Sequence, residues 1–198
     1  MKIFKGVPII DLGFYGSVIS SYKEELKKAG LITRFEEASK AIANVFKRMV
    51  SESSLTKANV LALLLAYRQL RTHSPLPVEL FNCMRTEKWI HTSLGFQSSS
   101  NTILFDNAWQ YLSPIAILPF IDDGDTCHGL GKDIYGYKDE LRELGVTVEV
   151  KFGARFVLAG LSIPDDPSIM SKATILSFLE CMKNYFDSAT EPPKGFKD

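Results

Sequence analysis

The sequence has no net charge, no closely spaced pair of cysteines and no long apolar run. Its 198 residues include 23 Lys plus Arg and 23 Asp plus Glu. Nucleic-acid binding as the main function normally brings a basic excess, so this balance argues against it. The longest strongly apolar segments, residues 60–66 and 115–121, are far shorter than the roughly 20 residues of a membrane-spanning helix. We therefore expect a chain that does not span a membrane.

The cysteines are few and scattered. Cys83, Cys127 and Cys181 are the only ones, and no two of them form a Cys-X-X-Cys pair. An odd, scattered set is typical of a reducing compartment, where a free thiol behaves as a small apolar residue. The first residues contain no long apolar region, so a secretory signal peptide is not expected. These features predict an intracellular protein, nuclear or cytoplasmic.

A long internal repeat is the main feature that the sequence does contain. Residues 137–146 resemble residues 22–31, at an offset of 115 positions (137 − 22 = 115). The same offset aligns residues 171–176 with residues 56–61. No catalytic constellation is duplicated along with these segments. The repeat therefore predicts a scaffold, in which neighbouring units stack and cover each other's apolar faces, rather than an enzyme.

The offset divides the chain into two units of the same kind. We expect a first, partial repeat at residues 1–74, a second repeat with a hairpin at residues 75–187, and a polar tail at residues 188–198. Thr56 and Ser171 are suited to cap the N-terminus of a helix, one in each unit.

Apolar residues recur mainly at helical spacing, which predicts a mainly helical α+β fold with short strands. Helices are expected at residues 16–29, 37–50, 60–70, 78–87, 134–144, 154–161 and 175–186. Strands are expected at residues 31–35, 89–93, 102–106 and 146–150. Residues 148–158 are also compatible with a hairpin that turns at residues 151–153, so this alternative stays open.

Two of these helices followed by a hairpin have the outline of a winged helix, with its binding elements in the helix at residues 78–87 and the wing at residues 89–105. This alternative is a nucleic-acid-binding module, in which Arg85, Lys88 and His91 would contact the nucleic acid. The zero net charge argues against it, as does the uncharged, Ser-rich connection at residues 95–101. A nucleic acid is therefore not the partner that we favour.

The most site-like stretch is the loop at residues 122–132, which combines carboxylates with a thiol and an imidazole. An EF-hand that began at Asp123 would have Cys127 at position 5 and no Glu at position 12, so the calcium pattern fails. A phosphate loop also fails, because Lys132 is followed by Asp133 rather than by a hydroxyl residue. The candidate residues of this loop are Asp122, Asp123, Asp125, Cys127 and His128.

An apolar segment that runs into paired carboxylates, at residues 117–125, also resembles the nucleophile loop of haloacid-dehalogenase-type phosphatases. A metal-dependent phosphoryl-processing enzyme that uses this loop is therefore a further alternative. Cys127 stands where that motif has Thr or Val. We expect a solvated loop that connects the repeats, and no catalytic residue, cofactor or metal ion in the chain.

The order of several segments is similar to that in the repeats of large plant proteins of the NO VEIN type, which are related to sacsin. The segments that carry this resemblance are residues 88–96, 103–106, 113–116, 118–123 and 137–141. It implies a repeat from a very long intracellular protein, with a chaperone-associated or scaffolding role. The partners that it implies are other proteins or neighbouring repeats.

The resemblance does not imply ATP hydrolysis. Near their N-terminus those proteins carry an ATPase domain of the kind shared by histidine kinases, DNA gyrase and heat-shock chaperones, whose adenine loop has the pattern Asp-X-Gly-X-Gly. Residues 122–126 match only its first half. The expected function is thus a non-catalytic repeat module for protein–protein interaction. Such a module should expose apolar surface where a neighbour is missing, near residues 3–10 or along residues 175–186.

Overall fold

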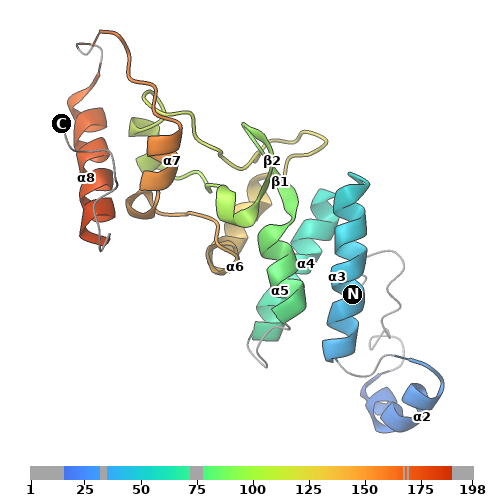
Figure 1. Cartoon of the computed structure of the whole chain (residues 1–198). Coiled ribbons are helices and arrows are strands. Elements are labelled where there is room, and N and C mark those ends of the chain that lie inside the picture. The colour runs from blue at the N-terminus through green and yellow to red at the C-terminus, as the bar shows by residue number, and fades with distance from the viewer. Residues whose placement is uncertain (1–15, 32–34, 72–77, 167, 169, 189–198) are drawn as a thin grey trace.

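The computed structural model describes residues 16–31, 35–71, 78–166, 168 and 170–188, and the fold is mainly helical (Figure 1). With 3-10 helices labelled η, the elements are η1 (Ser17–Tyr22), α2 (Lys23–Lys28), α3 (Phe35–Ser51), α4 (Lys57–Arg71), α5 (Val78–Thr86), β1 (Lys88–Thr92), β2 (Gly95–Ser98), η2 (Ser99–Asn101), η3 (Asn107–Tyr111), η4 (Lys132–Tyr137), α6 (Lys138–Glu143), η5 (Val150–Phe152), α7 (Ala154–Ala159) and α8 (Lys172–Ser188). In the described residues β1 and β2 form a two-stranded antiparallel sheet. The predicted α+β class is confirmed.

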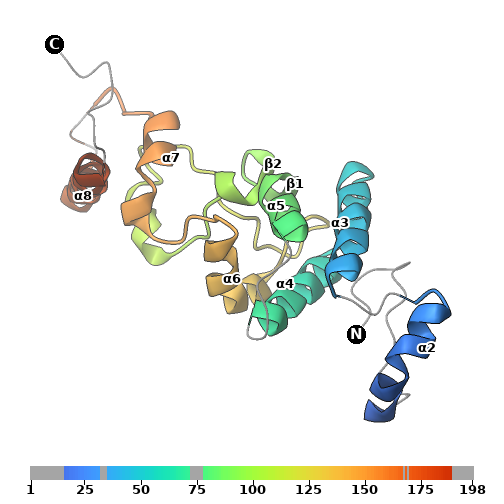
Figure 2. The same cartoon turned by 60° about the horizontal axis from the view of Figure 1, so that its bottom comes forward.

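The elements are arranged between two different ends. In both views α2 lies at one end and α8 at the other, while α3, α4, α5 and the hairpin lie between them (Figures 1 and 2). No helix in the described part of the chain has both the length and the apolar character needed to cross a membrane.

In the residues that the structure describes, two hydrophobic clusters form the core. The main cluster brings together α3, α4, α5, β1, η4 and α6, and includes Leu64 and Met84, both fully buried. The second cluster lies between η3, α7 and α8 around Trp109. The two clusters are joined, because the Nε1 of Trp109 donates to the carbonyl oxygen of Val148, a residue of the main cluster.

The predicted division at residue 74 falls among residues that the structure does not describe. Leu64 and Met84 lie on either side of it in the same cluster, so the two units share the main core. The tail at residues 189–198 and the first fifteen residues, including the segment 3–10, also lie outside the described residues.

The repeat is present in the backbone. Gly16 (φ 70°, ψ 179°) and Gly131 (φ 66°, ψ 174°) precede η1 and η4, which have 6 residues each. Each 3-10 helix leads directly into a 6-residue α-helix, α2 or α6. The positive φ of both glycines is a conformation that side-chain-bearing residues rarely adopt.

Both copies of this element end in the same way. Gly30 (φ 83°) and Gly145 (φ 96°) follow the helices in the left-handed region. One residue after each glycine, the backbone N–H of Leu31 donates to the carbonyl oxygen of Leu26 (2.9 Å), and the backbone N–H of Val146 donates to that of Leu141 (2.9 Å). The helix and glycine stop predicted twice from the sequence therefore form twice, although each helix begins as 3-10.

The last helix of each unit is also repeated at the offset of 115. The Oγ1 of Thr56 accepts from the backbone N–H of Asn59 (3.3 Å) at the start of α4. The Oγ of Ser171 accepts from the backbone N–H of Thr174 (3.0 Å) at the start of α8. Both residues thus act as the predicted N-caps.

The middle helix differs between the units. α3 is continuous over 17 residues, whereas its counterpart is divided at Gly153 into η5 and α7. A side chain at Gly153 would overlap the ring of Trp109, so a glycine is needed where the indole packs. The helix predicted at residues 154–161 is confirmed as α7, and the alternative hairpin at residues 148–158 is wrong.

The strands were predicted less well. β1 matches the strand expected at residues 89–93, but its partner β2 lies at residues 95–98, within the segment predicted to be the connection. Among the described residues, the segment 102–106 forms only single bridges, from Ile103 to Phe120 and to Thr147. The alternating strand predicted at residues 146–150 is also wrong. Within the part of the chain that the structure describes, it has only the bridge at Thr147, and Val146, Thr147 and Val148 are all buried.

The early turn of the hairpin explains this error. Gly95 has φ 83°, which permits a tight reversal, and the Oγ1 of Thr92 donates to its carbonyl oxygen across 2.7 Å. The strand predicted at residues 31–35 lies mostly outside the described residues, and Phe35 is the first residue of α3.

Candidate interaction surface

An ion pair with a buried carboxylate and a partly exposed guanidinium joins the two units. The Arg68 guanidinium on α4 binds the Glu140 carboxylate on α6 through two hydrogen bonds, Nε to Oε1 at 2.9 Å and Nη2 to Oε2 at 2.7 Å. Arg68 also donates to the carbonyl oxygen of Gly136 and stacks 4.6 Å over the ring of Tyr137. Glu140 is 0% exposed. Because an unpaired buried charge is costly, this geometry fixes α4 against η4 and α6.

Two further polar contacts lie along the same junction. The hydroxyl of Tyr67 donates to the Oε2 of Glu143 across 2.6 Å. The Nζ of Lys57 lies 3.0 Å from the Oδ2 of Asp133, in a more exposed pair. Together with the buried pair, these contacts follow α4 from its first turn to its last.

Between the polar contacts the junction is apolar. Val60 is 2% exposed and Leu64 is 0% exposed, and both belong to the cluster that contains Ile134 and Leu141 of η4 and α6. We call the stripe of α4 that faces η4 and α6 the junction stripe. Apolar burial of this kind contributes roughly 25 cal/mol per Å² removed from water.

The same stripe on α8 is exposed. Ile175 stands at the position of Val60 and is 42% exposed, and Leu179 stands at the position of Leu64 and is 55% exposed. Leu176 and Phe186 extend the exposed stripe along the helix. The neighbouring face of α8 packs on the second cluster through Cys181 and Met182, with Phe178 and Tyr185 beside them, so the orientation of the helix is fixed by its own core.

The first copy of the η–α element is exposed as well. α2 contains no buried residue, although its counterpart α6 buries Glu140 and Leu141 completely. Ile19 and Leu26, at the positions of Ile134 and Leu141, are only half-buried. Each end of the molecule thus carries one half of the junction that is closed in its middle.

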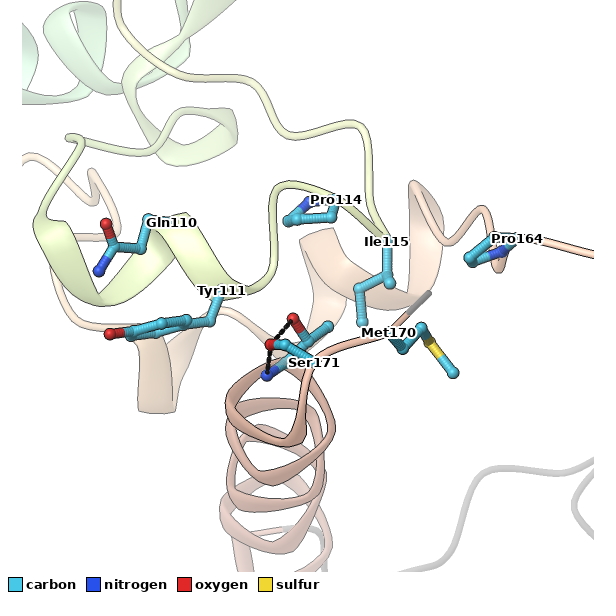
Figure 3. Close-up of a pocket in the computed structure, with 8 residues that line it drawn as sticks. Gln110, Tyr111, Pro114, Ile115, Pro164, Met170 and Ser171 are labelled. Atoms are coloured by element: carbon cyan, nitrogen blue, oxygen red, sulfur yellow. Dashed lines mark hydrogen bonds between the residues drawn. The ribbon is translucent and has the colours of Figure 1, made fainter. Parts of the chain in front are cut away.

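A pocket of about 420 Å³ opens beside the first turn of α8 (Figure 3). Two of its three hydroxyls are engaged with each other, since the Oγ of Ser171 and the Oγ1 of Thr174 are 2.9 Å apart. The lining residues are Gln110, Tyr111, Pro114, Ile115, Pro164, Met170, Ser171 and Thr174. None of them is charged at neutral pH, so the pocket offers a surface for packing rather than acid–base or metal chemistry.

Two carboxylates of the loop at residues 122–132, those of Asp122 and Asp123, form hydrogen bonds within the loop and with its surroundings. Asp122 accepts from the backbone N–H of Gly124 (3.0 Å) and the hydroxyl of Thr126 (2.9 Å), and lies 3.0 Å from the Nδ1 of His91. The Gly124 hydrogen bond is the main cause of a lowered pKa of Asp122. These contacts hold the loop closed on itself.

Asp123 faces other partners than Asp122. It accepts from Lys132 and from the hydroxyl of Tyr135, and the hydrogen bond from Lys132 is the main cause of its lowered pKa. Asp125 and Cys127 are exposed.

The fifth candidate of the loop, His128, packs against aromatic rings. Its ring lies 5.3 Å from that of Phe96 and 5.5 Å from that of His91. In the part of the chain that the structure describes, no group of three or more His, Cys, Asp or Glu side chains is placed to hold a metal ion.

The residues proposed for nucleic-acid binding are divided between two places. Lys88 and His91 lie on β1, where Lys88 lines a small pocket with Phe96 and His128. Arg85 lies on α5, over the ring of Phe81 and close to Gly145. The Nδ1 of His91 lies 3.0 Å from the Oδ2 of Asp122, and the side chain is 31% exposed.

The buried pair of Arg68 and Glu140 was missed in the sequence. A signal was present, because Glu140 lies three residues after Tyr137 and four before Leu144, and so shares the apolar face of α6. An acidic residue on an apolar stripe indicates a buried partner of opposite charge.

Comparison with known proteins does not identify a family, because no family model, curated protein or solved structure matches this chain. The resemblance to repeats of the NO VEIN type therefore stays a prediction.

Proposed function

We propose that this chain is a non-catalytic repeat module that binds other proteins. The observation that carries the proposal is the contrast between α4 and α8, which have the same sequence pattern and opposite exposure of the junction stripe. On α4 that stripe is covered by η4 and α6. On α8, Leu176 and Leu179 are more than half exposed. A contiguous exposed apolar stripe on a well-packed helix is characteristic of an interaction site.

The absence of catalysis is supported by the way in which the candidate polar groups are used. Asp122 and Asp123 accept hydrogen bonds that stabilise the loop, so both carboxylates already have partners within the protein. The pocket beside α8 is lined by uncharged residues.

We also propose that the module belongs to a long scaffold of the NO VEIN or sacsin type with a chaperone-associated role, in the nucleus or cytoplasm. The order of the resembling segments and the internal repeat support this assignment. An antibody raised against the chain should detect, in cells of the source organism, a protein much larger than 22.1 kDa. A single band at that mass would contradict the assignment.

The binding function is tested by substitutions on the exposed stripe. Leu176→Glu with Leu179→Glu places two charges on it, and Asn44→Glu with Asn82→Glu adds the same charge at exposed positions of α3 and α5. The immobilised wild type and the control should retain the same proteins from an extract of the source cells. The stripe variant should lose them by about tenfold, because a buried charge at an interface is costly. Equal retention by all three proteins would contradict the proposal.

A further inference from the structure

We propose that the exposed stripe of α8 binds the η1–α2 element of a second copy of this chain, head to tail. This inference rests on the proposed function and names its partner. The same kind of contact already exists within one molecule, where η4 and α6 cover α4. At the offset of 115 residues, η1–α2 corresponds to η4–α6, and α8 corresponds to α4.

The two halves of the proposed interface are exposed and lie far from each other in one molecule. η1 and α2 form one end, and α8 forms the other (Figures 1 and 2). One copy therefore cannot close the contact with itself in this arrangement, while two copies can.

The η1–α2 element already has the shape that the contact requires. Its backbone repeats that of η4–α6 from the first glycine, with φ of 70° and 66° at Gly16 and Gly131, to the last, with φ of 83° and 96° at Gly30 and Gly145. No folding step is needed on binding, so little conformational entropy is lost in the backbone.

The apolar positions match. Ile19 and Leu26 would occupy the places of Ile134 and Leu141. On the other side, Ile175 and Leu179 would occupy the places of Val60 and Leu64. All four residues that would become buried are apolar, and each is now at least partly exposed to water.

The charges at the centre of the junction are also retained. Lys183 stands at the position of Arg68, and Glu25 stands at the position of Glu140. Tyr22 replaces Tyr137, whose ring the Arg68 guanidinium covers. Lys183 and Glu25 are both exposed at present, so each is accessible to an opposite charge on a second copy.

The flanking polar contacts are not retained. Lys172 corresponds to Lys57, but Val18 stands where Asp133 forms the pair with Lys57. Met182 and Lys28 replace the hydrogen-bonded Tyr67 and Glu143. We therefore expect a weaker contact than the internal junction, formed at higher protein concentration. Because the two surfaces differ, repeated association gives an open chain or a ring.

Exchanging the charges at positions 183 and 25 tests whether these two residues meet across the proposed contact. Sedimentation velocity of the full chain should show larger species as its concentration rises. Lys183→Glu and Glu25→Lys should each weaken the association by about tenfold, since each places like charges together. An equimolar mixture of the two variants should restore it, because the acid introduced at position 183 of one copy meets the base introduced at position 25 of the other. Circular dichroism should show unchanged helix content in both.

A third variant separates this contact from non-specific adhesion. Val18→Asp supplies the carboxylate that Lys172 lacks, so the proposed register predicts tighter association, by about twofold to fivefold. Adhesion through exposed apolar residues predicts the opposite, because Val18 is 65% exposed and the variant removes it.

A wild type that stays monomeric at all concentrations would overturn the inference, as would a mixture that fails to restore association. Either result would leave the proposed function intact if the stripe variant still loses its proteins in the extract experiment. If the stripe variant and its control retain the same proteins from the extract while the full chain still self-associates, the proposed function is rejected and the self-association is not.

Discussion

At the scale of single residues, Glu140 determines how the two units meet. Its carboxylate is completely buried and depends on Arg68, whose side chain is 41% exposed, for two hydrogen bonds. Asp139, the neighbouring acid on α6, forms an exposed pair with Arg142 at 2.8 Å. Two adjacent carboxylates on one helix thus have very different surroundings.

Glu140→Gln should therefore destabilise the protein by about 1–3 kcal/mol, because it removes a charge-assisted pair from a buried site. Asp139→Asn makes the same chemical change one residue earlier and should cost less than about 0.5 kcal/mol. Urea denaturation at neutral pH measures both. Equal effects of the two substitutions would mean that the buried pair does not stabilise the junction.

The three thiols also differ in their surroundings. Cys127 is exposed, whereas Cys83 and Cys181 are buried, and burial raises the pKa of each buried thiol to about 11. The native protein should therefore react with a thiol reagent at Cys127 alone, and at all three cysteines after denaturation. A Cys127→Ser variant serves as the control and should show no rapid reaction. Rapid labelling of that variant would show that a core opens readily.

At the scale of elements, the helices were predictable because each carries its signal locally. α4 and α8 begin at Thr56 and Ser171, whose side chains cap them, and α2 and α6 end before Gly30 and Gly145. The strands were not predictable in this way. The short hairpin depends on the turn at Gly95, and the segment at Ile103 is held by single bridges to residues distant in the sequence.

The candidate sites show the same contrast between local and distant signals. The acidic loop was found from its composition, but the partners of Asp122 and Asp123, such as His91 and Tyr135, lie far away in the sequence or depend on the folded loop. The repeat predicts an exposed apolar surface near residues 3–10 or along residues 175–186, and the structure shows such a surface along the second of these segments, on α8.

Gly153 is the position at which the second unit departs from the first. Gly153→Ala should destabilise the protein by about 1–3 kcal/mol, because the added methyl group would overlap the ring of Trp109. Gly136→Ala, in η4, is the control, since nothing lies within 4 Å of the added atom. Thermal unfolding compares the two variants. A Gly153→Ala protein as stable as the control would show that the indole has room to move.

At the scale of the whole molecule, the two clusters should unfold together. Trp89 reports on the main cluster and Trp109 on the second, and the Nε1 of Trp109 is bonded to Val148 of the main cluster. Trp89→Phe and Trp109→Phe each leave one fluorescent probe. In urea, the fluorescence midpoint of each variant should coincide with its own midpoint by circular dichroism. Separate midpoints within one variant would indicate two independent folding units.

The difference between the ends of the molecule gives any assembly of it a direction. With α2 at one tip and α8 at the other (Figure 1), every joint in a row of copies would point the same way, and the two extremities would offer unlike surfaces. A single subunit defective at one extremity would then stop elongation on that side and leave the other side open. A small fraction of such defective subunits would therefore limit the length of the row, without any change to the subunits in its middle.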